Sequence, residues 1–180
     1  MAWNRQVKAF TRAAILWSLA TVALAQQNWC VPGEIVLLSG SVGQVKGDLF
    51  AAKGVLSLCA SPKDKPYKYL AYRYGNSSPE LVYEAPEDGQ FMLDHQQILP
   101  KAGIDILYFR IGDYTYAITD CQGMLCGIRT VRLMVFKDKK RILQLDADPQ
   151  QFVRNIDFLD DLADLPFVRK QRIGVSVDEK

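Results

Sequence analysis

The sequence predicts a mainly β protein, built as an antiparallel meander of seven to eight short strands with one helix near the C-terminal end. The first observation is a series of short segments rich in β-branched and aromatic residues and bounded by Gly, Pro, Asn or Asp. The second is that the links between these segments are short, which favours antiparallel neighbours. The third is that helical spacing of apolar residues occurs only near the C-terminal end. The pattern leaves open whether the sheet packs as a sandwich or closes as a barrel.

The predicted strands follow one another closely. Residues 34–38 (EIVLL) precede a glycine-rich stretch at 39–54, which indicates turns and a bulged hairpin. The later strands are VLSLCA (55–60), YKYLAYRYG (67–75), PELVYEA (79–85), DILYFRIG (105–112), YTYAITDC (114–121), IRTVRLMVF (128–136) and RILQLDA (141–147). In the stretch 128–135, Val131, Leu133 and Val135 share one face, and this apolar face is the better candidate for the core.

Three links resemble hairpin loops. GNSSP (75–79) joins the tyrosine-rich strand to PELVYEA, and the charged KDKK (137–140) joins the last two strands. Gly112-Asp113 is the sharpest signal, because glycine in the first position of a two-residue loop suits a type II′ turn.

The C-terminal part is expected to differ. Asp148 is a capping residue, and Pro149 suits the first helical position, so we predict a helix over 149–165. Phe152, Ile156 and Leu159 fall at helical spacing and can pack on the sheet. Pro166 ends the helix, and 167–180 is expected to be a loose tail or to form one edge strand at RIGVSV (172–177).

The N-terminal 25 residues have the features of a signal peptide. Arg5, Lys8 and Arg12 precede a short apolar run at 13–25 that ends in Ala-Leu-Ala, a small-x-small cleavage site. The run is short for a membrane span, which needs about 20 apolar residues. Cleavage would start the mature chain near Gln26, as a single domain over 26–180 without membrane insertion. The location predicted is the periplasm of a Gram-negative bacterium, or the exterior.

Charge argues against nucleic acid as a partner. The chain holds 22 Lys and Arg and 20 Asp and Glu, and the signal peptide contains three of the basic residues and no acidic one. The mature part therefore has 19 basic residues against 20 acidic ones, and this balance provides no electrostatic footprint for a phosphate backbone.

All four cysteines lie in the predicted mature part, which indicates disulfides rather than metal ligands in an exported chain. Of the three possible pairings we favour Cys30–Cys59 together with Cys121–Cys126, the second of which closes the short loop QGML. Zinc is the rival interpretation. The C-x4-C spacing has no second close pair, and the chain has one histidine, so we expect no metal and no cofactor.

The sequence shows no recognisable catalytic set. His95 lies in a polar stretch (DHQQILP) beside Asp94, without a nucleophile motif, and we interpret it as a solvated loop residue. The acids of 157–164 read as the solvated face of the helix, since the glycine of a calcium loop is absent. Scattered carboxylates of a hydrolase stay open as a weaker alternative, with the candidates Glu80, Glu84 and Glu87. Asn76-Ser77-Ser78 matches a glycosylation acceptor, but we interpret it as turn chemistry.

Tyrosines occur on both faces of the strand at 67–75. Leu70, Tyr72 and Tyr74 point one way, whereas Tyr69, Ala71 and Arg73 point the other. Structural tyrosines with cross-strand partners are the more common case. The second face can also meet a protein partner, because Tyr and Arg dominate interface hot spots. The residues predicted to contact such a partner are Tyr69, Arg73, Asn76 and Glu80, around the GNSSP loop.

The motifs LCAS (58–61), YLAYRYG (69–75) and PELVYEAP (79–86) resemble a signature of small exported proteobacterial proteins, mostly uncharacterised. The clear similarity covers about 58–86. It implies export and this order of strands, and it carries over no catalytic residue. The chain departs from the pattern at ILQLDA (142–147), where the family has a cysteine. Cys30 or the Cys121–Cys126 pair would then replace that bridge.

These observations together predict a non-enzymatic periplasmic binding protein with a protein partner in the cell envelope. The most concrete form is an inhibitor or immunity protein that blocks a cell-wall-degrading enzyme, by analogy with other small disulfide-bonded envelope proteins. One alternative is an envelope structural or assembly factor that binds through an exposed strand edge. The other is the carboxylate-dependent hydrolase.

Overall fold

The computed structural model describes residues 28–47, 49–61, 66–100, 102–122 and 130–175. The predicted signal peptide and its cleavage site lie outside these residues. The elements are β1 (Ile35–Lys46), β2 (Leu49–Ser61), β3 (Tyr69–Gly75), β4 (Pro79–Ala85), β5 (Phe91–Leu99), β6 (Ala102–Ile111), β7 (Tyr114–Gln122), β8 (Thr130–Lys137), β9 (Lys140–Ala147), β10 (Val153–Arg154), α1 (Phe158–Leu162) and β11 (Val168–Lys170). The predicted mainly β fold with antiparallel strands is confirmed.

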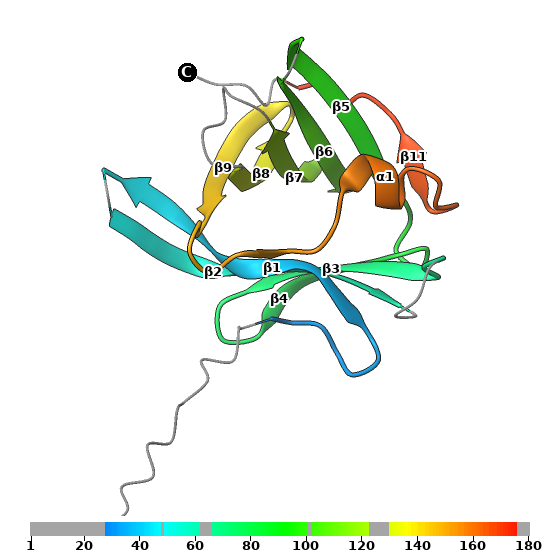
Figure 1. Ribbon diagram of the computed structural model, residues 1–180, viewed down its shortest axis with the longest axis horizontal. Helices are drawn as coiled ribbons and strands as arrows, with labels where there is room; N and C mark the ends of the chain where they lie inside the picture. Colours follow the sequence, from blue (N-terminus) through cyan, green and yellow to red (C-terminus); the bar gives the residue numbers. More distant parts are fainter. Residues whose placement is uncertain (1–27, 48, 62–65, 101, 123–129, 176–180) are drawn as a thin grey trace, which may run out of the picture.

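All strands belong to one curled sheet, in the order β11-β5-β6-β7-β8-β9-β1-β2-β3-β4, with β10 added beside β1. Every pairing is antiparallel except β11 with β5, which is parallel. The chain-distant strands β1 and β9 meet where Val42 faces Ala147. As Figure 1 shows, β1–β4 form one layer and β5–β9 curl over it, with α1 at the side of the opening.

Over the described residues the sheet has eleven strands, instead of the seven to eight predicted. The glycine-rich stretch 39–54 belongs to two long strands, β1 and β2, with a register shift between Val42 and Gly43. The predicted bulged hairpin is therefore present. Sequence analysis missed β5, because four consecutive polar residues from Asp94 to Gln97 obscure its alternation. It also missed β10 and β11, which are two and three residues long.

Two hairpin turns have the backbone that their strands require. Gly112 has a φ of 56°, and Asp113 is not among the residues with positive φ, which fits the predicted type II′ turn rather than type I′. In the β8–β9 turn, Asp138 and Lys139 have φ values of 50° and 66°. Positive φ at both central positions is the requirement of a type I′ turn.

The predicted helix over 149–165 is wrong in its extent. Residues after Asp148 form a turn and then β10, and the helix covers only Phe158–Leu162. Its N-cap is Asp157, whose carboxylate accepts hydrogen bonds from the backbone N–H of Leu159 and Asp160. Pairing of Val153 and Arg154 with β1 prevents an earlier start, because a ladder residue cannot also be helical. Phe158 and Leu162 are its buried residues.

The tail expected to be loose is ordered up to residue 175. Val168–Lys170 forms the edge strand β11, four residues before the predicted RIGVSV segment. Gln171 N–H then donates to Leu93 O, and Ile173 N–H donates to the buried Asp94 carboxylate. Residues 176–180 lie outside the described part. The tail is held because it covers apolar residues on the outer face of β5–β8.

The main core lies between the two layers and centres on aromatic side chains. Phe109 of β6 stacks on Tyr83 of β4 at 4.1 Å between ring centroids and on Tyr116 of β7 at 5.2 Å. Tyr72 of β3 meets Phe109 edge-on at 4.9 Å. The strand β3 therefore packs across the interior against β6, as expected for a curled sheet. Val131 and Leu133 of the predicted inner face are in this core. Met134 on the opposite face of the strand is buried in a second core, and residues 128 and 129 lie outside the described part.

A second, smaller core lies on the opposite face of β6–β8. It contains Ile104, Ile106, Tyr108, Ala117, Met134, Phe136 and Ile173. Because β6 is buried on both faces up to Phe109, its sequence there is apolar except for Asp105 and does not alternate. In the described part of the chain, no helix is long and apolar enough to cross a membrane.

Candidate functional site

The outer face of the tyrosine strand holds a buried ion-pair network. Arg73, only 6% exposed, donates to both carboxylate oxygens of Glu34, at 2.7 and 3.0 Å, and to Glu84 at 2.6 Å. The Tyr69 hydroxyl donates to Glu34 as well. Glu34 lies just before β1. It binds Tyr69 and Arg73 on the face of β3 that the sequence predicts to meet a protein partner. Arg73 is therefore occupied within the molecule.

This network shifts the pKa values of its members. Burial raises the pKa of Glu34, but hydrogen bonds from Arg73, Tyr69 and the Val31 backbone outweigh it, so the net pKa lies below the ordinary 4.5. Burial and the hydrogen bond to Glu34 raise the pKa of Tyr69 to about 12. Burial opposes the charge of Arg73, yet the two glutamates raise its pKa overall. Glu34 and Arg73 are thus both charged at neutral pH, with Tyr69 as a neutral donor.

The other two predicted contact residues lie at the GNSSP loop. The Asn76 N–H donates to Glu80 Oε1 at 3.2 Å, and both residues are exposed. The four predicted residues thus form two pairs: Tyr69 with Arg73 around Glu34, and Asn76 with Glu80 on the loop. Of the three hydrolase candidates, Glu80 and Glu84 have partners within the molecule, and Glu87 is exposed. Glu84 is paired with Arg73, and Glu80 closes its own loop.

The predicted disulfide Cys30–Cys59 is present, with the Cα atoms 5.6 Å apart. It ties the segment before β1 to the buried end of β2. Cys121 is also oxidised, and its predicted partner Cys126 lies outside the described residues. Glu34 approaches the Cys30 and Cys59 sulfurs. These sulfurs are joined in a disulfide and offer no thiolate, so the group is not a metal site in this state.

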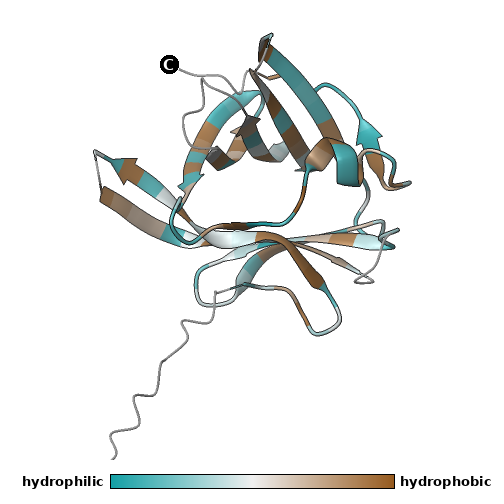
Figure 2. Cartoon of the chain, viewed as in Figure 1, coloured by the Kyte–Doolittle hydropathy of each residue, from teal (hydrophilic) through white to brown (hydrophobic). Residues whose placement is uncertain are grey.

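A hairpin arm, defined here as residues 43–47 and 49–53, projects from the sheet as the far end of β1 and β2 (Figure 1). Its strands pair with each other beyond the last β1–β9 contact at Gly43 and the last β2–β3 contact at Val55. Leu49 is 77% and Val45 52% exposed. Figure 2 shows hydrophobic colour over the start of β2 and alternating hydrophobic and hydrophilic colour on the facing end of β1.

Two features of the sequence direct the arm away from the sheet. The register shift at Val42/Gly43 is a bulge, which increases the local twist and bends the hairpin. Gly43 allows the two strands to approach, because a Cβ there would lie 2.1 Å from Ala51 O. An exposed two-stranded ribbon is marginally stable alone. The arm therefore presents apolar side chains at low internal stability.

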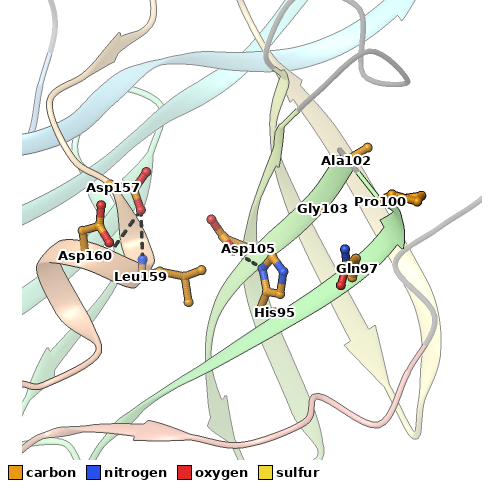
Figure 3. A pocket seen from close by; sticks show the side chains of 9 residues that line it. All are labelled: His95, Gln97, Pro100, Ala102, Gly103, Asp105, Asp157, Leu159 and Asp160. Carbon is orange, nitrogen blue, oxygen red and sulfur yellow. Dashed lines mark hydrogen bonds and ion pairs between the residues drawn. The ribbon is translucent and has the colours of Figure 1, made fainter.

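A polar pocket of about 370 Å3 opens at the end of the inner face, between β5, β6 and the first turn of α1. It is lined by His95, Gln97, Pro100, Ala102, Gly103, Asp105, Asp157, Leu159 and Asp160. Figure 3 shows His95 and Asp105 on one wall and the two α1 aspartates on the other. His95 is thus a strand residue in a pocket, and the prediction that it lies in a loop is wrong.

His95 is held on two sides. Its Nδ1 lies 2.7 Å from Oδ1 of Asp105, the cross-strand partner on β6, which is 2% exposed. Its ring packs on Gly103, where a Cβ would come within 2.7 Å of His95 Cε1. Asp94, the neighbour of His95 in the sequence, does not hold the ring. The Asp94 carboxylate instead accepts from Gln96 Nε2 and Ile173 N–H on the outer face.

Two further buried charged residues, Asp120 and Arg154, lie behind the pocket. Asp105 faces Asp120 across the β6–β7 ladder, and Asp120 forms an ion pair with Arg154 of β10. Arg154 Nη2 also lies 3.9 Å from Asp157 Oδ2. Two carboxylates on neighbouring strands would repel each other, and His95 and Arg154 offset this repulsion from either side. The alternation of DILYF placed Asp105 on the Leu107 face, a signal that an acid lies on the core side.

Comparison of the chain with protein-family models, with curated proteins and with solved structures finds no match.

Proposed function

We propose that the protein is an exported, non-enzymatic binding protein that blocks a cell-wall-degrading enzyme in the periplasm or outside the cell, with the hairpin arm as its main contact. Export rests on the N-terminal sequence pattern. The Cys30–Cys59 disulfide is compatible with an oxidising compartment. The enzyme in question is the partner predicted in the cell envelope.

The observation that carries the proposal is the exposure of apolar side chains on a projecting element. Val45 and Phe50 are cross-strand partners, so both point to the same face of the arm, and Leu49 adds apolar surface on the other. Large apolar side chains gathered on one projecting element are typical of an interaction site, whereas single ones are ordinary surface. In this proposal the arm, a hairpin of two strands, enters the substrate cleft of the enzyme and blocks access of the substrate.

Charge favours a lytic enzyme as the partner. Lys46 and Lys53 are exposed on the arm. Enzymes that cleave glycans carry a pair of catalytic carboxylates in the cleft. A hairpin that combines apolar contact area with lysines complements such a cleft. Arg73, which the sequence predicts as a contact residue, is buried in the structure. In this proposal the main contacts with the enzyme are therefore made by the arm.

The test measures peptidoglycan hydrolysis by a panel of carboxylate-dependent lytic enzymes in the presence of the mature protein. We expect inhibition of at least one enzyme by the wild type. The arm variant Val45→Ser/Leu49→Ser should weaken inhibition by about tenfold or more, since each lost contact is worth on the order of 1 kcal/mol. The matched control Val82→Ser/Ile142→Ser removes apolar residues of 44% and 53% exposure elsewhere and should inhibit normally.

A second pair of variants tests the loop. Asn76→Ala/Glu80→Ala removes the exposed pair of the GNSSP loop and leaves the Arg73 network in place. Loss of inhibition only in this variant would move the contact to the loop. Absence of inhibition of every enzyme in the panel would reject the inhibitor proposal itself.

The alternative of an envelope assembly factor is favoured by one observation. In the described pairings, the arm strands are hydrogen-bonded to each other only, so their outer edges are open to a strand from another protein. This alternative predicts that the protein copurifies with an envelope complex through the arm and inhibits none of the enzymes tested.

A further inference from the structure

We propose that the pocket between β5, β6 and α1 binds a small polar ligand carrying a primary ammonium group, of the chemical class of amino sugars. The proposal is independent of the hairpin arm. It begins from His95, whose ring is fixed by a buried carboxylate on one side and by the Gly103 backbone beneath it. Surface histidines are ordinarily free to rotate, and this one is positioned.

The other ring nitrogen of His95, Nε2, is the atom that can contact a ligand. Nδ1 is engaged by Asp105, which fixes the tautomer of the neutral ring with its proton on Nδ1. Nε2 is then the acceptor, and within the described part of the chain no side chain or backbone group is seen to hydrogen-bond to it. A hydroxyl or ammonium of a ligand in the pocket can donate to this nitrogen.

Acidic side chains predominate among the charged groups that line the pocket. Asp105, Asp157 and Asp160 contribute three carboxylates against one imidazole. Arg154 lies behind the wall and is paired with Asp120. The pocket is therefore electronegative, which favours a cationic ligand and disfavours phosphate or sulfate. Asp160 is exposed on the α1 wall, on the side of the pocket that faces His95 in Figure 3.

The size of the pocket and its uncharged lining residues restrict the kind of ligand that fits. A pocket of about 370 Å3 is at the small end of ligand sites and suits a molecule with a single ring. Leu159, Pro100 and Ala102 provide apolar surface for the carbon face of a sugar ring. The Gln97 amide supplies a polar group at the rim. A single pyranose ring with hydroxyls and one ammonium group matches this lining.

The experiment uses the only histidine of the chain as its reporter. Imidazole NMR signals of His95 are followed during titration of the mature protein with glucosamine, and separately with N-acetylglucosamine, which has the same ring without the charge. We expect saturable shifts with glucosamine and an affinity at least about tenfold weaker for the acetylated sugar, because the charge-assisted hydrogen bond is lost.

Two variants locate the site. Asp160→Asn should weaken glucosamine binding about tenfold, and the matched control Asp164→Asn, on the same segment but outside the lining, should bind normally. Gly103→Ala pushes on the His95 ring and should also weaken binding while the thermal unfolding temperature stays close to that of the wild type. Equal shifts with both sugars, no shift with either, or shifts produced by Ca²⁺ but not by glucosamine would overturn the proposal.

Discussion

At the scale of single residues, Arg73 shows how an ion pair within the molecule changes the role predicted for one face of a strand. In the sequence it is an arginine between tyrosines, which is the composition of an interface hot spot. In the fold it is buried between Glu34 and Glu84. Glu34 is 39 residues away, and no local pattern connects the two. The tyrosines at 67–75 are accordingly structural: Tyr72 and Tyr74 face the core, and Tyr69 supports Glu34.

The Arg73→Ala variant should lose about 3–5 kcal/mol of unfolding free energy, because it leaves the Glu34 carboxylate buried without its cation. Arg132→Ala is the matched control. It breaks the half-exposed pair with Asp146 and should cost about 1 kcal/mol or less. Urea unfolding followed by circular dichroism measures both. Similar small losses in the two variants would show that Arg73 is not structural.

Glu34 should make stability depend on pH in the acidic range. Its pKa is lower in the folded protein than the ordinary 4.5, so its contribution is complete above 4.5 and disappears as the pH falls through the folded pKa. The stability difference between wild type and Glu34→Gln should therefore be largest at neutral pH and shrink at about pH 3. Urea unfolding at several pH values measures it, with the exposed Glu87→Gln as control. A difference that grows on acidification would contradict this assignment.

At the scale of elements, the wrong or missing predictions have two causes, a distant strand partner and a polar strand sequence. Helical spacing at Phe152, Ile156 and Leu159 is real, but the pairing of Val153–Arg154 with β1 overrides it. Polar residues concealed β5, because a strand near the sheet edge tolerates His95 and its neighbours. Conversely, strands with strong alternation, short links and clear turn residues were predicted correctly. Local pattern determines the element wherever no distant partner competes for the same backbone.

The C-terminal segment offers a test at this scale. Ile173 is buried in the second core, so Ile173→Ala should cost about 2–5 kcal/mol, the usual range for such a core truncation. Val175→Ala, at a partly buried position of the same segment, should cost less. Thermal and urea unfolding of both variants provide the measurement. A negligible loss in Ile173→Ala would show that the segment is loose in solution, as the sequence suggested.

At the scale of the whole molecule, the fold class, the Cys30–Cys59 bridge and the inner faces of several strands were predictable from composition and alternation. The pocket was not. His95 and Asp105 are ten residues apart on different strands, and Asp157 joins them only when α1 closes the end of the sheet. Sequence shows which residues can carry charge, whereas the curl of the sheet determines which of them meet.

The Cys30–Cys59 bridge should stabilise the whole domain. It spans a separation of 29 residues, for which the loss of chain entropy in the unfolded state corresponds to roughly 3.5 kcal/mol. Cys30→Ala/Cys59→Ala should lower the unfolding free energy by about this amount without changing the far-ultraviolet circular dichroism spectrum. A loss below about 1 kcal/mol would show that the segment before β1 is held by the Glu34 network instead.

The position of β1 between β9 and β2 has a consequence for the order of assembly. Strands β1–β4 and β5–β9 each join sequence neighbours, but Val42 and Ala147 meet only after a long loop has closed. We therefore expect two locally formed ribbons and a final seam between β1 and β9. Pulse-labelling hydrogen exchange during refolding would show the seam amides protected last, and simultaneous protection of all strands would contradict this order. Until the seam closes, the two ribbons would expose the edges that could pair with the wrong chain.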